Sequence, residues 1–445
     1  MDMEDRFGGT FYDFIIKHMD DDPDRLALSK EKWAGIDTSA AVSTIGGRRR
    51  IRSKLPLWYA DQRLVYPTRL CIEQCSSQAA AEYKASLVRQ IKPGGKVADL
   101  TSGLGVDDWA FAREGCQVLY NDASPLLCEA ARHNFHCLGI TADFRCGEVA
   151  PGKVAEILGG FKPNLIYIDP ARREAGTGRK TFKLADCSPD VLALASELRR
   201  LGADILLKLS PMADISTVVA DLSAAFSGDG GNSLSINVMC KTAQRLFVRE
   251  LHIVECEGEC KELLVWLSRR EGGEEKPRLT VAVCGEETAT LSAELGTEAF
   301  LKPSLYTSGA EALAGACLFE PGKALSKSGL FKTLGQRFGL KELGISTHLY
   351  VSSEIAADLF PFGKIYRITS VLPLSSQNIK DLSHKDIAGT LSVRNVPLSA
   401  PGLSRRLRLK PSQTRHIFAC HIDSLSANFL LFTEPFQTVP TNRAY

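Results

Sequence analysis

One stretch decides the fold of this chain: Val97-Ala98-Asp99-Leu100-Thr101-Ser102-Gly103-Leu104-Gly105-Val106-Asp107. Its apolar beginning predicts a buried strand that ends in an acid, and its glycines predict a tight turn before a helix. Glycines let the backbone approach a ligand closely, and the free N–H groups at a helix start can hold that ligand. The stretch therefore predicts a strand, a ligand-binding loop and a helix in succession.

The alternation of strands and helices continues after this stretch. Short apolar runs predict strands at 97–100, 118–120, 165–168 and 205–209, with helices at 106–113, 125–138, 189–201 and 214–226. This order is typical of βαβ units around a parallel sheet. The apolar segments 246–256 and 261–268, joined by Glu257-Gly258-Glu259, predict an antiparallel hairpin that closes the edge of the sheet. We therefore expect an α/β fold.

The remaining patterns divide the chain into four parts. Residues 1–90 carry helical patterning, and 91–270 contain the predicted sheet. A charged, glycine-containing linker follows, and two small α+β units are expected at 277–365 and 366–437.

Composition excludes several classes of protein. The 54 Lys and Arg residues nearly balance the 52 Asp and Glu residues, so nucleic-acid binding would require a local patch. No run of about 18 apolar residues predicts a membrane span, and the acidic start does not resemble a secretory signal. The 13 cysteines are odd in number and scattered, which indicates reduced thiols and a cytoplasmic location.

The acids after the first two strands indicate the ligand. A dinucleotide-binding loop requires Gly-x-Gly-x-x-Gly, but Asp108 stands at the third glycine position, and carboxylates would repel a pyrophosphate. S-adenosylmethionine suits the loop better, because it brings an ammonium group for Asp99. Asp122 follows Asp99 by 23 residues, close to the roughly 20 typical of a ribose-binding acid, and Glu148 could accept the adenine amino group. The alternative is a structural α/β core whose glycines only form turns.

The predicted cofactor-binding residues in the sheet domain are Asp99, Thr101, Ser102, Gly103, Gly105, Asp107, Asp122, Ala123, Glu148 and Asp169.

The fourth strand ends in Asp169-Pro170-Ala171-Arg172. Open parallel sheets bind ligands beyond the carboxyl ends of their strands, which predicts Asp169 beside the transferable methyl group. Asp169, Pro170 and Arg172 are the candidate catalytic residues. The alternative is an ordinary Asp-Pro turn that ends a strand.

These motifs resemble class I S-adenosylmethionine-dependent methyltransferases. The segment from Asp99 to Gly105 is similar to their first motif, Asp122 to their second-strand acid, and 169–172 to their fourth motif. Amine-directed members usually carry a second proline and an aromatic residue, where this chain has Ala171 and Arg172. Methylation of a pyrimidine carbon usually requires a cysteine nucleophile, and the fourth-strand loop has none before Cys187.

A wider resemblance covers about residues 65–437. The segments 70–77 and 254–262 and the C-terminal block are similar to a bacterial group of class I methyltransferases with a THUMP-like domain. The resemblance implies a Rossmann-like seven-stranded methyltransferase core, a ferredoxin-like module at 277–365 and a THUMP-like module at 366–437. It also implies that Glu73 and Gln74 pack over the cofactor.

A basic patch lies in the C-terminal block. Between Ile387 and Ile422 there is no Asp or Glu, and the basic residues are Arg394, Arg405, Arg406, Arg408, Lys410 and Arg415. Such a local field suits phosphates, and THUMP-related domains are associated with structured RNA. The fourth-strand loop adds further candidate RNA-binding residues, Arg173, Arg179 and Lys180. The alternative for the patch is a solvated basic face.

Together these features predict a methyltransferase that acts on a base in structured RNA, either tRNA or rRNA. Two alternatives remain: a methyltransferase of a protein or small molecule, and a non-catalytic RNA-binding protein that retains the cofactor fold. The pair His133-x-x-His136 lacks further ligands nearby in the sequence, so no metal site is predicted.

Overall fold

The computed structural model describes residues 6–28, 35–172, 183–227, 245–269 and 276–436. These described residues form two compact units, one within the bounds 1–277 with 284–288 and the other within 278–283 with 289–445. None of the helices in these described ranges is long and apolar enough to cross a membrane.

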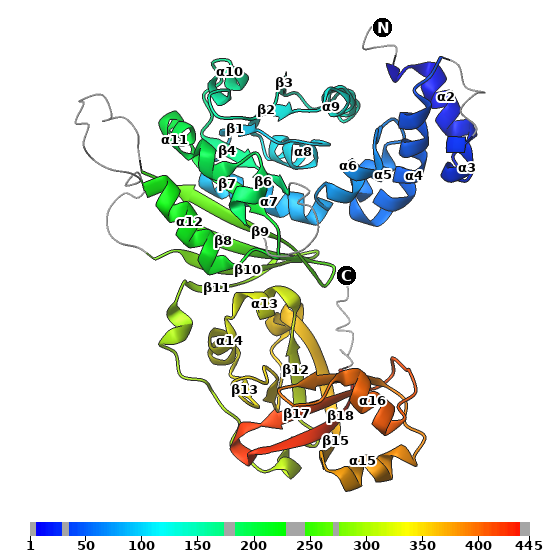
Figure 1. Ribbon diagram of the computed structural model, residues 1–445, viewed down its shortest axis with the longest axis vertical. Coiled ribbons are helices and arrows are strands. Elements are labelled where there is room, and N and C mark those ends of the chain that lie inside the picture. Colours follow the sequence, from blue (N-terminus) through cyan, green and yellow to red (C-terminus); the bar gives the residue numbers. More distant parts are fainter. Residues whose placement is uncertain (1–5, 29–34, 173–182, 228–244, 270–275, 437–445) are drawn as a thin grey trace, which may run out of the picture. The chain divides into compact units, whose positions relative to one another are not determined.

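The sheet of the first unit is parallel in its centre and antiparallel at one edge. Its strands are β1 (Lys96–Asp99), β2 (Gln117–Asp122), β3 (Asp143–Cys146), β4 (Leu165–Ile168), β7 (Asp204–Leu209), β8 (Phe247–Cys256) and β9 (Glu259–Ser268). They follow the order β8-β9-β7-β4-β1-β2-β3, and β9 pairs antiparallel with both β7 and β8 (Figure 1). The order reverses direction between β1 and β4, and such a switch point leaves a crevice at the carboxyl ends of the strands.

The predicted hairpin is present with a tighter turn. Glu257 and Gly258 have φ values of 55° and 71°, and Cys256 pairs directly with Glu259. Two residues with positive φ form the turn whose twist matches an antiparallel pair, so β9 begins two residues earlier than predicted.

Helices precede, connect and follow the parallel strands. They are α7 (Gln78–Ile91), α8 (Val106–Arg113), α9 (Pro125–Cys137), α10 (Val154–Leu158), α11 (Val191–Leu201) and α12 (Ile215–Ser227). Several begin with a side-chain cap; for example, Asp190 accepts hydrogen bonds from the N–H groups of Leu192 and Ala193. This cap explains why α11 begins at Val191 rather than at the predicted Pro189.

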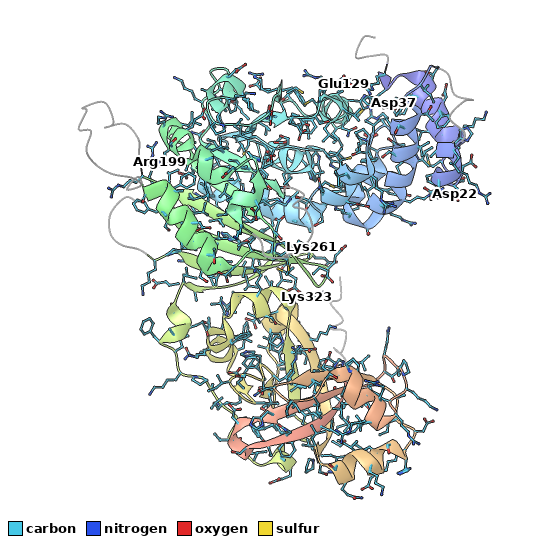
Figure 2. The ribbon with its side chains drawn as sticks, viewed as in Figure 1. Asp22, Asp37, Glu129, Arg199, Lys261 and Lys323 are labelled. Atoms are coloured by element: carbon cyan, nitrogen blue, oxygen red, sulfur yellow. The ribbon has the colours of Figure 1, made fainter. Side chains whose placement is uncertain are left out.

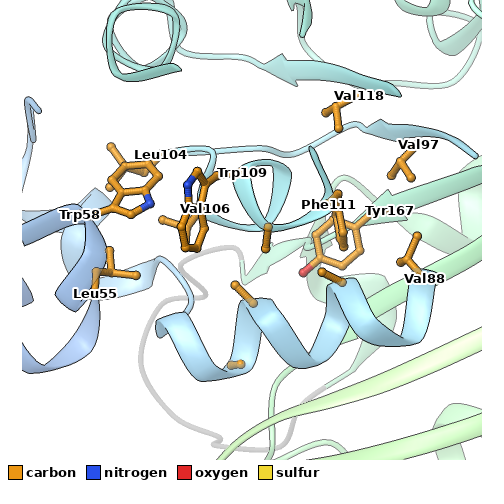
Figure 3. Packing of buried hydrophobic residues seen from close by; sticks show 14 of the residues in the cluster. Leu55, Trp58, Val88, Val97, Leu104, Val106, Trp109, Phe111, Val118 and Tyr167 are labelled. Atoms are coloured by element: carbon orange, nitrogen blue, oxygen red, sulfur yellow. The ribbon is translucent and has the colours of Figure 1, made fainter. Parts of the chain in front are cut away.

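The main core lies between the sheet and the helices that precede and follow β1. Val88 on α7, Val97 on β1 and Phe111 on α8 are buried in one apolar cluster (Figure 3). Trp58 from the N-terminal region joins the same cluster, with its ring centroid 6.1 Å from that of Trp109. The N-terminal helices therefore share a core with the sheet domain.

The N-terminal region is helical, as predicted. It contains α2 (Gly9–Lys17), α3 (Pro23–Leu28), α4 (Thr38–Lys54), α5 (Pro56–Ala60) and α6 (Arg69–Gln74). Arg6 joins it to α9 through ion pairs with Asp37 (2.9 Å) and Glu129 (2.5 Å), whose positions are labelled in Figure 2. Arg48, in the basic run of α4, is buried and donates to the Leu64 carbonyl at 3.4 Å, so this run is partly structural.

The second unit is built around its own sheet. A hairpin of β10 (Arg278–Cys284) and β11 (Ala289–Glu294) comes first along the chain. The sheet of seven strands has the order β13-β14-β12-β15-β18-β17-β16. Its strands are β12 (Cys317–Pro321), β13 (Lys341–Glu342), β14 (Tyr350–Ser352), β15 (Gly363–Pro373), β16 (Thr390–Arg394), β17 (His416–Ile422) and β18 (Ala427–Pro435), with helices α13 (Lys323–Ser328), α14 (Phe331–Phe338), α15 (Ser376–Ser383) and α16 (Ala400–Leu407).

The long strand β15 joins the two predicted C-terminal modules. It pairs with β12 on one side and with β18 on the other. The predicted border between residues 365 and 366 therefore falls inside a strand that both modules share.

Candidate active site

A cleft of about 680 Å³ opens at the switch point of the first sheet. We call it the central cleft. Most of the predicted cofactor-binding and catalytic residues line it, namely Gln74, Asp99, Thr101, Ser102, Gly103, Asp107, Asp122, Ala123, Glu148, Asp169 and Pro170. Segments far apart in the sequence are thus brought together as the fold of parallel strands requires.

Hydrogen bonds tie the ends of β1 and β4 together. The Thr101 N–H donates to Asp99 Oδ1 at 2.8 Å, and the Asp169 N–H donates to Thr101 Oγ1 at 2.7 Å. Burial, together with the nearby Asp108 carboxylate, raises the pKa of Asp99 well above its usual value. A cationic group of a ligand beside Asp99 would relieve this unfavourable environment.

The second-strand acid is held by the glycine loop. Gly103 has φ +59°, and its N–H donates to Asp122 Oδ2 at 2.9 Å, while the Ser124 N–H donates to Oδ1 at 2.8 Å. Burial raises the pKa of Asp122, and these two hydrogen bonds oppose the rise. The carboxylate is therefore fixed in the cleft wall with lone pairs left for a ligand.

Gly105 has a different role from the predicted one. It has φ +82°, and a Cβ at this position would lie 2.7 Å from a ring atom of Phe135. It does not appear among the residues that line the cleft. The structure therefore explains Gly105 by the close packing of the start of α8 against α9.

The two acids of α8, Asp107 and Asp108, also lie in surroundings that the sequence did not predict. Asp107 reaches the cleft wall, but Lys84 lies 3.1 Å from its carboxylate and Tyr167 donates to it at 2.9 Å. Burial works against ionisation of Asp107, yet the ammonium groups of Lys84 and Lys208 keep its pKa below the usual value. Asp108 is fully buried outside the cleft lining. The two acids would therefore repel a pyrophosphate less than the sequence suggests.

Only one of the two predicted residues of α6 faces the cleft. Gln74 lines it, whereas the Glu73 carboxylate pairs with Arg69 at 2.6 Å and with Arg50 at 3.2 Å on the exposed side. Consecutive helical residues point about 100° apart, so both could not face the same ligand. In this structure Glu73 is a surface ion-pair residue outside the cleft lining.

The chain after β4 turns into a short two-stranded pair. In it, β5 (Ala171–Arg172) pairs with β6 (Cys187–Ser188). Ser188 and Pro189 line the central cleft. The side chain of Arg172, a predicted catalytic residue, lies outside the described part of the structure. The predicted RNA-binding residues Arg173, Arg179 and Lys180 lie outside the described residues.

A buried ionic network beneath the cleft is absent from the sequence predictions. The Lys84 ammonium, with no exposed surface, lies 2.9 Å from Glu262 and also contacts Asp107. Lys208 on β7 forms an ion pair with Asp169. Both lysines could have been noticed, because each interrupts a buried apolar pattern: Ala80, Ala81 and Ala85 around Lys84, and 205–209 around Lys208.

The described ranges contain no group of three or more His, Cys, Asp or Glu residues placed to hold a metal ion. His133, considered above as a ligand, instead contacts the Tyr12 hydroxyl and lies 3.1 Å from the Arg63 carbonyl.

The basic patch is partly neutralised. Arg394 pairs with Glu320 at 2.8 Å, and Lys410 pairs with Asp386 at 2.7 Å. Asp386 immediately precedes the acid-free segment 387–422, and the fold brings the more distant Glu320 to it. The exposed part of the patch centres on α16, where Arg405 and Arg406 are exposed while its leucines are buried.

The sheet order, the glycine loop and the acid-ended strands together define the fold of a class I methyltransferase. Comparison with known proteins agrees. Two proteins of Mycobacterium tuberculosis, from strains CDC 1551 and H37Rv, are each named as an uncharacterized S-adenosylmethionine-dependent methyltransferase. Each is 24% identical to this chain over 344 residues, which is 77% of this chain and 80% of the relative.

A crystal structure is also similar to this chain over nearly its whole length. It is that of an inferred methyltransferase from Porphyromonas gingivalis W83, with a TM-score of 0.76 and 29% identity over 96% of this chain and 98% of the other. A ferredoxin-like domain model matches residues 318–361, and a THUMP domain-like model matches 363–435. The comparisons confirm the predicted fold and support an S-adenosylmethionine-dependent methyltransferase.

Proposed function

We propose that this chain is an S-adenosylmethionine-dependent methyltransferase of structured RNA, either tRNA or rRNA. The observation that carries the proposal is the central cleft, in which acids end two neighbouring strands beside a glycine loop. Asp99 would receive the amino group of the cofactor, Asp122 its ribose hydroxyls and Glu148 its adenine amino group. When bound, the cofactor would supply a methyl group carried on a sulfonium, and Asp169 would act at the point of transfer.

The RNA part of the proposal has separate support. The THUMP domain-like match covers residues 363–435, which contain the basic patch. Free thiols among the described cysteines are consistent with the reducing cytoplasm, where tRNA and rRNA are found. The sequence predicts a base as the methyl acceptor. A base amine and a ribose hydroxyl, however, need different hydrogen-bonding partners at the end of β4.

Replacing Asp99 with alanine should weaken S-adenosylmethionine binding at least about tenfold, or roughly 1.4 kcal/mol. The variant removes the carboxylate proposed to face the ammonium group. Isothermal titration calorimetry measures the effect, with Asp143→Ala, an exposed acid of β3, as the control. Equal affinity of the Asp99→Ala and unmodified proteins would contradict the cofactor assignment.

The double variant Arg405→Ala with Arg406→Ala should weaken RNA binding and reduce its salt dependence. Each lost phosphate contact lowers the slope of log affinity against log salt by about 1. Fluorescence anisotropy with labelled tRNA at several salt concentrations gives the slope. Arg337→Ala, at an exposed position of α14, is the control. An unchanged slope would remove α16 from the RNA-binding surface.

The whole proposal is tested by incubating the RNA, protein and small-molecule fractions of a strain that lacks this protein, each separately, with the enzyme and radiolabelled methyl donor. Labelled RNA is the expected result. Label in protein or in small molecules alone would favour the first alternative predicted from the sequence. Cofactor binding with no methyl transfer to any cellular fraction would favour a non-catalytic RNA-binding protein.

A further inference from the structure

The carboxylate at the end of β4 already has a cationic partner. Lys208 forms an ion pair with Asp169 Oδ2, and both residues line the central cleft. Their side chains are 13% and 34% exposed, so the pair can be reached from the cleft. A target group that enters here meets an ammonium donor and a carboxylate acceptor together.

Lys208 is held in its charged form. Burial disfavours the charge, but the carboxylates of Asp169, Glu262 and Asp107 raise the pKa of Lys208 above its usual value. Lys84 balances part of the negative charge of Glu262 and Asp107. An ammonium has three N–H donors and no acceptor. Lys208 can therefore serve a substrate only by donating a hydrogen bond or by stabilising negative charge.

An exocyclic base amine does not match this pair. Its nitrogen carries two N–H donors, and its single lone pair must attack the methyl group, so it has nothing to accept a hydrogen bond from Lys208. A methylated amine also becomes positively charged before it loses a proton, which a neighbouring ammonium disfavours. Ala171 stands where amine-directed enzymes carry a second proline, which agrees with this mismatch.

A hydroxyl matches both partners. Its oxygen has one O–H donor and two lone pairs. The O–H can donate to Asp169 and one lone pair can accept from Lys208, which leaves the second lone pair for attack. The 2′-hydroxyl is the hydroxyl that distinguishes RNA from DNA, and proteins contact it in RNA recognition.

We propose, on the basis of the function proposed above, that the methyl acceptor is a ribose 2′-hydroxyl of RNA, held between Asp169 and Lys208. The oxygen lone pair forms the C–O bond as the bond between the methyl carbon and the sulfonium sulfur breaks. The sulfur takes the electron pair of that bond and leaves as a neutral sulfide. The hydroxyl proton passes to the Asp169 carboxylate and from there to solvent through the cleft.

Alkaline hydrolysis of the labelled RNA tests this proposal. Alkali cleaves RNA through its free 2′-hydroxyl groups, so 2′-O-methylation leaves the label in an alkali-resistant dinucleotide. The probe is total tRNA and rRNA from the strain lacking the protein. Label in dinucleotides supports the proposal, and label in mononucleotides overturns it while leaving RNA methylation in place. Absence of label, with cofactor binding retained, overturns both proposals.

The variant Lys208→Met tests the role of the ammonium. We expect methyl transfer to fall about a hundredfold, as for the loss of a contact that positions a reacting group, while the affinity for S-adenosylmethionine remains unchanged. Lys162→Met, at an exposed position of the same unit, is the control. A transfer rate within twofold of that of the control would contradict a role for Lys208. Because the product analysis uses the unmodified protein, the proposal remains testable if Lys208→Met does not fold.

Discussion

Replacing Lys84 with methionine should lower the free energy of unfolding of the first unit by about 3–5 kcal/mol, the usual cost of removing one partner of a buried ion pair. Lys84 has no exposed surface and lies within hydrogen-bond or ion-pair distance of Ser76, Asp107 and Glu262. Methionine fills a similar volume, so the loss would come from two buried carboxylates left without their cation, and not from a cavity.

Tryptophan fluorescence can follow this unfolding in the full chain. All four tryptophans precede residue 278, so denaturant titration monitored by their emission reports on the first unit. Lys92→Met, an exposed lysine at the end of α7, is the control. In the double variant Lys84→Met with Glu262→Gln, the second substitution should lower the free energy of unfolding by less than it does alone, because the two charges interact. A loss below about 1 kcal/mol for Lys84→Met would contradict the importance of the network.

The parallel strands were the most predictable part of the fold. β4 begins and ends where predicted, because all four of its residues are buried and a strand covered on both faces is a continuous apolar run. α8 also has its predicted limits, Val106 and Arg113. The shared strand β15 was not predicted, because pairing on both of its edges depends on β12 and β18, which are distant in the sequence.

The candidate site was predictable where its residues follow a strand, and not where they depend on long-range partners. Asp99, Asp122 and Asp169 each lie at the carboxyl end of a parallel strand, which the strand pattern alone places in the cleft. Lys84 and Glu262 are 178 residues apart. No local spacing shows that a lysine on α7 meets an acid on β9, although a single charge in an apolar pattern indicates that a partner must exist.

Partners distant in the sequence also explain why two predictions about local charge differ from the structure. Counting residues 387–422 indicated a patch without acids, but side chains from Glu320 and Asp386 reach it in the folded unit. Counting acids near the glycine loop suggested repulsion of a diphosphate, but Lys84 compensates Asp107. Net charge along the sequence is a weak guide to the field at a site, because the fold brings in distant counter-charges.

Replacing Asp169 with asparagine should lower single-turnover methyl transfer about a thousandfold, within the range of 10²–10⁴ typical of general acid–base catalysis. Asparagine keeps the size of the side chain and can still accept a hydrogen bond from Lys208. It cannot take up the proton of the acceptor hydroxyl as the C–O bond forms. The main-chain hydrogen bond from the Asp169 N–H to Thr101 is retained, so the ends of β1 and β4 should keep their positions.

Rapid-quench measurements with saturating RNA and methyl donor give the transfer rate, and calorimetry gives the cofactor affinity. The matched control is Asp143→Asn on β3, which is exposed and outside the cleft lining. A decrease in transfer with unchanged cofactor affinity would agree with a role in the chemical step. If both fell together, Asp169 would belong to cofactor binding instead. An unchanged transfer rate would leave the Asp-Pro turn as the end of a strand with no part in catalysis. A carboxylate that can be replaced without effect on that rate does not receive the proton.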